Sequence, residues 1–238
     1  MTQHLDPENL YVAVDILFLT VGQGRLFVLL SRRPEPPEQG LWALPGTFIG
    51  RNESADEATQ RLTDEMLPGA KAYSEQLYTF SRVDRDSRGR VITIAYVTVI
   101  PYPEMEGLLP GSTFRPFAAG IREGKLSLTD GGGQPLDADS LAFDHGEIIL
   151  TGIRRLQGKI DYSDIGLRFL SDPDRFTMVE LEEIFDAVQE QKTDKSNFRR
   201  FIRSRYEETG RIAATGELVR QGRGRPAVLY RWNGSDRS

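Results

Sequence analysis

The sequence contains no cysteine, and that absence removes two classes of site. Neither a disulfide nor a metal centre with thiolate ligands is available to this chain. The apolar runs are short as well: the longest have the length of a β-strand, well below the length that spans a membrane. At the N-terminus no basic stretch precedes an apolar one, so a secretion signal is not predicted. We expect a cytoplasmic protein with no membrane partner.

Internal repeats and low-complexity tracts are also absent, and 238 residues are enough for two domains of modest size. The net charge of −5 conceals an uneven distribution. Residues 191–238 hold 12 Lys and Arg against 5 Asp and Glu, whereas residues 1–190 hold 18 against 30. A basic block on an acidic protein favours a polyanionic partner, although a solvated basic surface would have the same composition.

Strand-length apolar runs separated by turn residues fill the first half of the sequence. YVAVDILFLT and RLFVLLSRR flank a Gly-Gln-Gly turn, and this order predicts a β-hairpin. The segment SADEATQRLTDEML has helical spacing, with Asn52 or Ser54 as the N-cap and Pro68-Gly69 as the stop. Two further strands are predicted on either side of the turn DSRG. The prediction for residues 1–138 is an α+β domain with a mixed sheet.

The composition changes at DADSLAFDHGEIILTGIRRLQGKI, which has the pattern of one long amphipathic helix. We expect this helix, over 139–158, to join the first domain to a second domain at 159–238. The second domain opens with DYSDIGLRFL, which we also expect to be helical. Thr177-x-x-Glu180 then forms a capping box at a helix start. A basic helix around 193–206 and two strand-like runs complete the order that a winged helix-turn-helix requires.

The basic helix has one apolar and one charged face. Phe198 and Ile202 fall at helical spacing and are expected to pack against the preceding helix. On the charged face, Arg can pair with guanine in the major groove, and Asn197 would either read adenine or cap the helix. Arginines interleaved with glycine at the hairpin tip suit phosphates or a minor groove. The predicted DNA-binding residues are Thr193, Lys195, Ser196, Asn197, Arg199, Arg200, Arg203, Arg220, Arg223 and Arg225.

In the first half, Glu53 and Arg61 stand eight positions apart within LWALPGTFIGRNESADEATQRLTDEMLPG. This stretch resembles the Nudix box, whose family pattern is G-x5-E-x7-R-E-U-x-E-E-x-G-U, with U an aliphatic residue. Glu65 is retained, but the residues that replace the pattern are Thr47, Leu62, Met66 and Pro68. Carboxylates at positions 62, 65 and 66 would share one helix face and hold Mg²⁺ against a diphosphate, whereas one carboxylate is a poor magnesium site. We therefore predict no metal site and no catalytic residue, and we interpret the retained charges as salt bridges along a helix.

A scaffold that has lost catalysis can still bind a diphosphate. Arg32 and Arg33 end a strand, and four arginines between residues 82 and 90 surround the next hairpin turn. The planar guanidinium can bind two diphosphate oxygens at once. The alternative is exposed hairpin charge paired with Asp84 and Asp86. The predicted ligand-binding residues are Arg32, Arg33, Phe48, Glu53, Arg61, Glu65, Arg82, Arg88 and Arg90.

Nearly end to end, the chain is similar to the Nudix-related transcriptional regulators of the NAD-metabolism repressor type. The segments that carry the resemblance are LWALPGTFI, EQLYTFSRVDRDSRGRVITIAY, LAFDHGEIILTGIRRLQGKIDY, FTMVELEEIF, NFRRFI and GRGRPAVLYRW. Similar proteins join a Nudix-like α/β/α sandwich to a C-terminal winged helix, form homodimers and bind palindromic double-stranded operator DNA. The resemblance implies repression of genes for NAD synthesis and salvage, with no cofactor and with ADP-ribose as the effector that releases the repressor. Related regulators of this architecture sense arabinose or other metabolites instead.

Two other functions fit parts of the sequence. Glu53, Arg61 and Glu65 would belong to an active Nudix hydrolase of ADP-ribose or another nucleoside diphosphate, but Leu62 and Met66 stand where that enzyme needs carboxylates. The basic segment would also suit an adaptor that meets RNA or an acidic protein. Its aromatic residues, however, have the spacing of a core rather than that of a surface for single-stranded nucleic acid.

Overall fold

Strand β1 (Leu10–Gly22) lies at the centre of the first sheet, and its residues from Ala13 to Val21 are buried. Apolar, β-branched and aromatic side chains favour such a strand, and burial of consecutive residues means that both faces of the sheet are covered. The computed structural model describes residues 5–6, 8–137, 140–220 and 226–234.

The first sheet has eight strands within the described residues. They are β1, β2 (Arg25–Arg32), β3 (Trp42–Ala43), β4 (Gly46–Phe48), β5 (Tyr73–Phe80), β6 (Arg90–Val99), β7 (Phe114–Arg122) and β8 (Lys125–Thr129). The order is β5-β6-β1-β2-β7-β8, with β3 paired to β2 and β4 to β1. Strand β1 is parallel to β6, and the other pairs are antiparallel, so the predicted mixed sheet is confirmed. The predicted hairpin is present too: Gln23 and Gly24 have φ values of 52° and 69°, as a tight hairpin turn requires.

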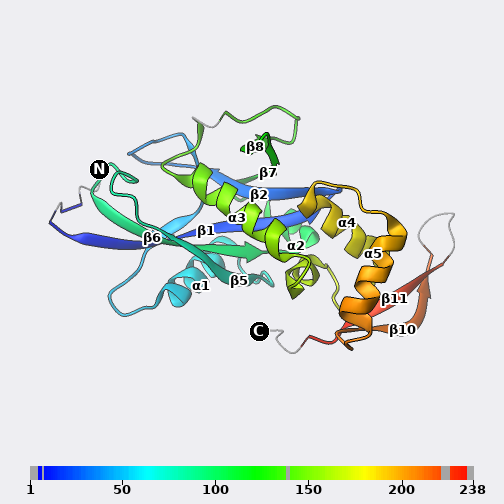
Figure 1. Ribbon diagram of the computed structural model, residues 1–238. Coiled ribbons are helices and arrows are strands. Elements are labelled where there is room, and N and C mark those ends of the chain that lie inside the picture. Colours follow the sequence, from blue (N-terminus) through cyan, green and yellow to red (C-terminus); the bar gives the residue numbers. More distant parts are fainter. Residues whose placement is uncertain (1–4, 7, 138–139, 221–225, 235–238) are drawn as a thin grey trace.

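Helices cover the two faces of this sheet, which confirms the α/β/α sandwich (Figure 1). On one face, α1 (Ala55–Met66) and α2 (Tyr102–Leu108) pack Leu62 and Met105 against Ile16 and Phe18 of β1. Helix α1 begins with a capping box formed by Ser54 and Glu57, so Ser54 is the N-cap.

The opposite face of the sheet is covered by α3 (His145–Lys159), whose buried side chains pack against alternate residues of β1. The predicted helix over 139–158 is wrong at its start. Phe143 has a φ of 52°, and Leu141 forms a bridge to Trp42, so the chain enters the helix only at His145. A left-handed residue ends helical hydrogen bonding, which explains the late start.

The second module follows the predicted order. Its elements are a 3-10 helix (Asp164–Phe169), β9 (Phe176–Thr177), α4 (Met178–Gln189), α5 (Lys195–Ile202), a π-helical turn (Arg203–Glu207), β10 (Ile212–Val219) and β11 (Ala227–Trp232). The three strands pair in the order β10-β11-β9. Thr177 and Glu180 form the predicted capping box. The winged helix-turn-helix is therefore confirmed, and the segment before β9 is a 3-10 helix rather than an α-helix.

One apolar core runs through both modules. Leu17 and Leu19 of β1, Ile153 of α3, Phe185 of α4 and Phe198 of α5 belong to a single cluster of buried side chains. Helix α4 thus packs directly on the end of the first sheet and on α3. Within the described residues, no helix has the length and apolar character needed to cross a membrane.

Candidate nucleic-acid interface and ligand cavity

The sequence around α5 sets the geometry of a helix-turn-helix. Glu190 ends α4 with a left-handed φ of 52°, which reverses the chain direction. Asp186 accepts a hydrogen bond from the backbone N–H of Thr193 at 2.8 Å, and Asp194 then caps α5 by accepting from the N–H groups of Ser196 and Asn197. The helix cap is therefore Asp194, and the Asn197 side chain remains available for another role.

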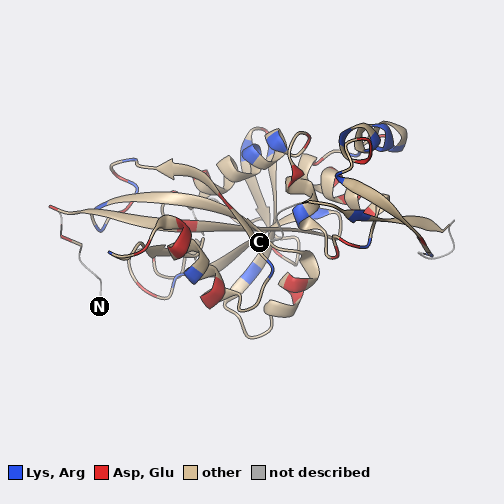
Figure 2. Cartoon of the chain, turned by 90° about the horizontal axis from the view of Figure 1, so that it is seen from below, with Lys and Arg blue, Asp and Glu red and all other residues tan. Residues whose placement is uncertain are grey.

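Packing decides which face of α5 meets solvent. Phe198 and Ile202 are buried, and the Phe198 ring lies 5.4 Å from that of Phe185 on α4. All the predicted DNA-binding residues of this region are exposed: Thr193, Lys195, Ser196, Asn197, Arg199, Arg200 and Arg203. Figure 2 shows the basic residues of α5 beside the hairpin of β10 and β11.

Two polar contacts organise that exposed face. The Arg200 guanidinium donates to the Asn197 side-chain oxygen at 2.9 Å, which holds the two groups as a pair. Arg203 lies 3.6 Å from Glu208, and both side chains are well exposed. On the wing, Arg220 is exposed directly after β10, whereas Arg223 and Arg225 lie outside the described residues.

A separate cavity of about 270 Å³ opens at one end of the first sheet. Its lining combines the predicted residues Arg33, Phe48 and Arg88 with Thr47 and Phe143. The Arg33 guanidinium lies 4.6 Å from the centre of the Phe143 ring, and that of Arg88 lies 5.4 Å from Phe48 and 5.6 Å from Phe143. The cavity therefore presents aromatic faces and two guanidinium groups to one space.

The two guanidinium groups repel one another. Burial, and next the charge of Arg88, lower the pKa of Arg33. Asp86 compensates Arg88 through an ion pair of 2.7 Å, and hydrogen bonds from Arg88 hold the pKa of Asp86 down although burial raises it. An anion between Arg33 and Arg88 would relieve their repulsion.

A buried ionic network forms the floor of the cavity. The Arg85 side chain is only 4% exposed and bridges Asp15 at 3.1 Å and Asp144 at 2.7 Å. Burial lowers the pKa of Arg85, but the hydrogen bonds and charges of these two aspartates outweigh it and raise the pKa overall. Next to them, His145 accepts from the Leu44 N–H through Nδ1 at 2.9 Å, and burial lowers the pKa of its imidazole.

The three retained charges on the α1 side form a salt-bridged row. Arg61 donates two hydrogen bonds to Glu53, at 2.7 and 3.1 Å, and lies 3.6 Å from Glu65. Glu53 also accepts from the Gly50 N–H at 2.7 Å. The Arg61 hydrogen bonds, and next the Gly50 amide, lower the pKa of Glu53 to about 2. In the described part of the chain, no group of three His, Asp or Glu residues is arranged to hold a metal ion.

Comparison with known proteins matches both modules. Residues 171–232 fit the NrtR DNA-binding winged helix domain, and residues 9–102 fit the NUDIX domain. The structure of Shewanella oneidensis NrtR in complex with a 27mer DNA is 30% identical, with a TM-score of 0.74 and coverage of 93% of each chain. The chain belongs to the family of NrtR-type, Nudix-related transcriptional regulators.

Two further relatives match this regulator along most of its length. The ADPR responsive transcriptional repressor NtrR of Acinetobacter baylyi is 28% identical, over 97% of this chain and 85% of its own. A MutT/nudix family protein from Enterococcus faecalis is 28% identical, with a TM-score of 0.73 and coverage of 98% of this chain and 91% of its own.

The regulator's other predicted ligand residues do not line the cavity. Arg32 stacks on Trp42 at 4.5 Å and faces a different groove. Arg82 pairs with Asp84 at 2.9 Å, and Arg90 donates to the Arg82 carbonyl at 3.1 Å. Glu53, Arg61 and Glu65 are also absent from the residues that line the cavity.

Several cavity residues are missing from the predicted set. Asp15, Phe143 and His145 come from two distant segments, and Arg85, one of the four arginines of the hairpin turn, comes from a third; no local spacing joins them. One signal was available: Asp15 interrupts an otherwise apolar strand, and a buried carboxylate needs a charged or hydrogen-bonding partner.

Proposed function

We propose that this regulator is a repressor that binds operator DNA through α5 and the wing and releases it when ADP-ribose occupies the cavity lined by Arg33 and Arg88. The observation that carries the proposal is the exposed basic face of α5, fixed by burial of Phe198 and Ile202 on the opposite side. The family relationship adds a DNA complex for one relative and ADPR responsiveness for another. The division into a sensor at 1–138, a joining segment at 139–158 and a DNA-binding part at 159–238 belongs to the same proposal.

On the DNA side, the paired Asn197 and Arg200 side chains are the base-reading candidates. They lie in the first two turns of α5, and N-terminal residues of a recognition helix reach base edges most readily. Lys195, Arg199 and Arg203 supply charge for phosphates, as do the arginines of the wing. Two copies of the chain related by a twofold axis would occupy half-sites about one DNA turn apart in a palindrome. We place the dimer contact on α3 and the sensor.

On the effector side, the cavity offers groups for two parts of ADP-ribose, the diphosphate and the base. Arg33 and Arg88 would bind the diphosphate, whose oxygens suit a bidentate guanidinium. Phe48 and Phe143 provide flat apolar surface for a base. Genes for NAD synthesis and salvage are the proposed targets, because a repressor released by ADP-ribose would link their expression to NAD turnover.

We also propose that the sensor binds ADP-ribose without hydrolysing it. Leu62 is buried in the apolar cluster beneath α1, where a Nudix hydrolase would present a carboxylate. Glu53 is hydrogen-bonded to Arg61 at 2.7 Å, and Glu65 lies 3.6 Å from the same guanidinium, so both retained carboxylates face a positive side chain. The competing function, an ADP-ribose hydrolase, predicts Mg²⁺-dependent release of AMP that Glu65→Gln abolishes. We expect no release of AMP from the wild type or from Glu65→Gln. Release by the wild type that Glu65→Gln abolishes would show that the domain hydrolyses ADP-ribose and does not merely sense it.

The experiment that tests the proposed function is a mobility-shift titration on DNA upstream of the chain's own gene and of NAD-synthesis genes. A shifted band that resists random competitor DNA at physiological salt, and that ADP-ribose dissolves, is the expected result. A thermal-shift panel of ADP-ribose, NAD and arabinose identifies the effector, because a ligand of the folded state raises the melting temperature. Equal binding to operator and random DNA would contradict sequence-specific repression. A thermal shift with arabinose alone would show that the effector is arabinose and not ADP-ribose.

A further inference from the structure

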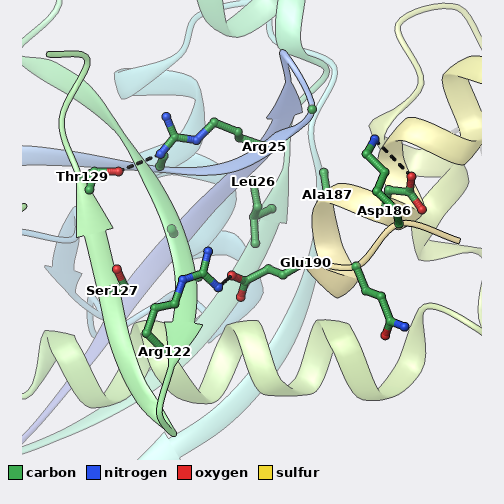
Figure 3. A pocket seen from close by; sticks show the side chains of 14 residues that line it. Arg25, Leu26, Arg122, Ser127, Thr129, Asp186, Ala187 and Glu190 are labelled. Carbon is green, nitrogen blue, oxygen red and sulfur yellow. Dashed lines mark hydrogen bonds and ion pairs between the residues drawn. The ribbon is translucent and has the colours of Figure 1, made fainter. Parts of the chain in front are cut away.

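The end of α4 meets the edge of the sensor sheet beside a second cavity, of about 400 Å³ (Figure 3). The cavity is lined by residues of β2, β7 and β8 on one side and by the last turn of α4 on the other. Across it, the Glu190 side chain points from the α4–α5 turn toward Arg122. This place is distinct from the Arg33 cavity, since the two share none of their lining residues.

The Glu190 carboxylate joins the helix-turn-helix to β7. Its Oε1 accepts the backbone N–H of Ile121 at 2.6 Å, and its Oε2 accepts from Arg122 at 2.5 Å. Pairing of β2 with β7 ends at Ala118, so β2 does not bond to the backbone N–H of Ile121. The Glu190 carboxylate accepts that N–H in place of a neighbouring strand. Only 17% of the Glu190 side chain is exposed. We call the contacts of Glu190 with Ile121 and Arg122 the β7 latch.

Gly120 makes room for the β7 latch. A β-carbon at position 120 would overlap both carboxylate oxygens of Glu190, and the backbone of Gly120 has no positive φ that would otherwise require glycine. Glycine at this position is therefore explained by the approach of the carboxylate rather than by a turn. Replacement by alanine would expel the carboxylate without removing it.

A second tie holds the same end of α4 to α3. The Gln157 side chain donates to the Val188 carbonyl at 3.0 Å, and the Gln189 side chain donates to the Gln157 carbonyl at 3.1 Å. The helix α3 that carries Gln157 begins at His145, which lines the Arg33 cavity. One rigid element thus reaches from that cavity to the end of α4.

On its other side, the β7 latch is next to the recognition helix. Asp186 on α4 holds the Thr193 amide, and Asp194 caps α5 four residues after Glu190. A shift of Glu190 relative to β7 would therefore turn α5 as a unit. In a dimer that binds two half-sites, such a turn changes the distance between the two recognition helices.

We propose that Glu190 is the positioning residue through which the sensor sets the orientation of α5, with the latched arrangement competent for operator binding and the effector favouring its release. The inference rests on the proposed function, because it requires both an operator and an effector. A ligand shifts such an equilibrium only by its differential affinity for the two arrangements. Loss of the β7 latch must therefore reduce the change in operator affinity that ADP-ribose causes, and not merely the operator affinity itself.

The test uses the full chain and a labelled operator duplex, with operator Kd measured at zero and at saturating ADP-ribose. Their ratio is the response factor, and effectors of this type typically change affinity by about 5- to 150-fold. In both Glu190→Ala and Gly120→Ala we expect operator Kd without ADP-ribose to rise toward the effector-bound value of the wild type. The response factor should then fall below about 2-fold. Glu190→Gln, which keeps the acceptor for Ile121, should restore part of the response.

Controls separate the possible failures. Glu183→Ala removes an exposed carboxylate two turns earlier on α4 and should leave the response factor unchanged. ADP-ribose affinity measured without DNA reports whether each variant is folded, because the Arg33 cavity does not include Glu190. An undiminished response factor in Glu190→Ala and Gly120→Ala overturns the inference, even if operator affinity falls. A wild-type chain that ignores ADP-ribose instead overturns the proposed function.

Discussion

Arg33 and Arg32 are adjacent in the sequence, yet they serve different surfaces. Arg33 faces Phe143 within the cavity, whereas Arg32 stacks on Trp42 outside it. Successive residues at the end of a strand point to opposite sides, so the pair forms a natural comparison. Local sequence identified two arginines but not which one lines the cavity.

Arg33→Ala should weaken ADP-ribose binding by about 10-fold or more, since hydrogen bonds to charged groups contribute about 1.5–3 kcal/mol. Arg32→Ala, the matched control, should change that affinity by less than about 2-fold. Isothermal titration calorimetry measures both. Equal losses from the two substitutions would place the diphosphate elsewhere.

His145 gives the sensor a characteristic pH dependence. Burial lowers the pKa of its imidazole, so the unfolded chain takes up a proton near pH 6.5 that the folded chain does not. The free energy of unfolding should therefore fall as the pH drops below about 6.5. His145→Asn should flatten this slope between about pH 5 and 6.5, where carboxylates contribute little. Urea unfolding at several pH values measures it, and an identical slope in both proteins would show that His145 takes up protons alike in the folded and unfolded chain.

At the scale of elements, the helices and strands were largely predictable because their signals are local. The N-cap at Ser54, the capping box at Thr177 and the periodicity of Phe198 and Ile202 each lie within one turn or two. The start of α3 was not predictable, because it depends on the bridge between Leu141 and Trp42, which is a long-range contact. The network of Asp15, Arg85 and Asp144 was missed for the same reason.

Helix α5 and the wing should contribute differently to DNA binding. Arg200→Ala should cost about 1–3 kcal/mol on the operator and relax base preference, because a side chain that reads a base edge is lost. Arg220→Ala should weaken operator and random DNA alike and lower the slope of log K against log salt by about one. Fluorescence anisotropy at several salt concentrations distinguishes them. If Arg200→Ala and Arg220→Ala weakened binding to operator and to random DNA by the same factor, the assignment of base reading to α5 and phosphate binding to the wing would be wrong.

At the scale of the whole molecule, the shared core predicts that the two modules form one unit of stability. The chain has two tryptophans, Trp42 in the sensor and Trp232 on the wing strand β11. The continuous cluster from β1 through α3 to α5 predicts that they unfold together. This continuity was not predictable, since the sequence suggested two domains joined by a helix.

Single-tryptophan variants test that cooperativity. In Trp42→Phe the fluorescence reports the winged helix, and in Trp232→Phe it reports the sensor. Within each variant, the fluorescence midpoint in urea should coincide with that of far-ultraviolet circular dichroism, because two-state unfolding gives coincident transitions for all probes. Separated midpoints in either variant would mean that the modules unfold independently.

The most direct measurement is the affinity of the full chain for a duplex from its own upstream region, with and without ADP-ribose, beside a scrambled duplex at physiological salt. We predict operator binding at least about 10³-fold tighter than binding to the scrambled duplex, as is typical of specific recognition. ADP-ribose should weaken the operator complex by at least about 5-fold. Equal affinity for the two duplexes, or an operator affinity that ADP-ribose leaves unchanged, would contradict a repressor governed by its Nudix-like sensor.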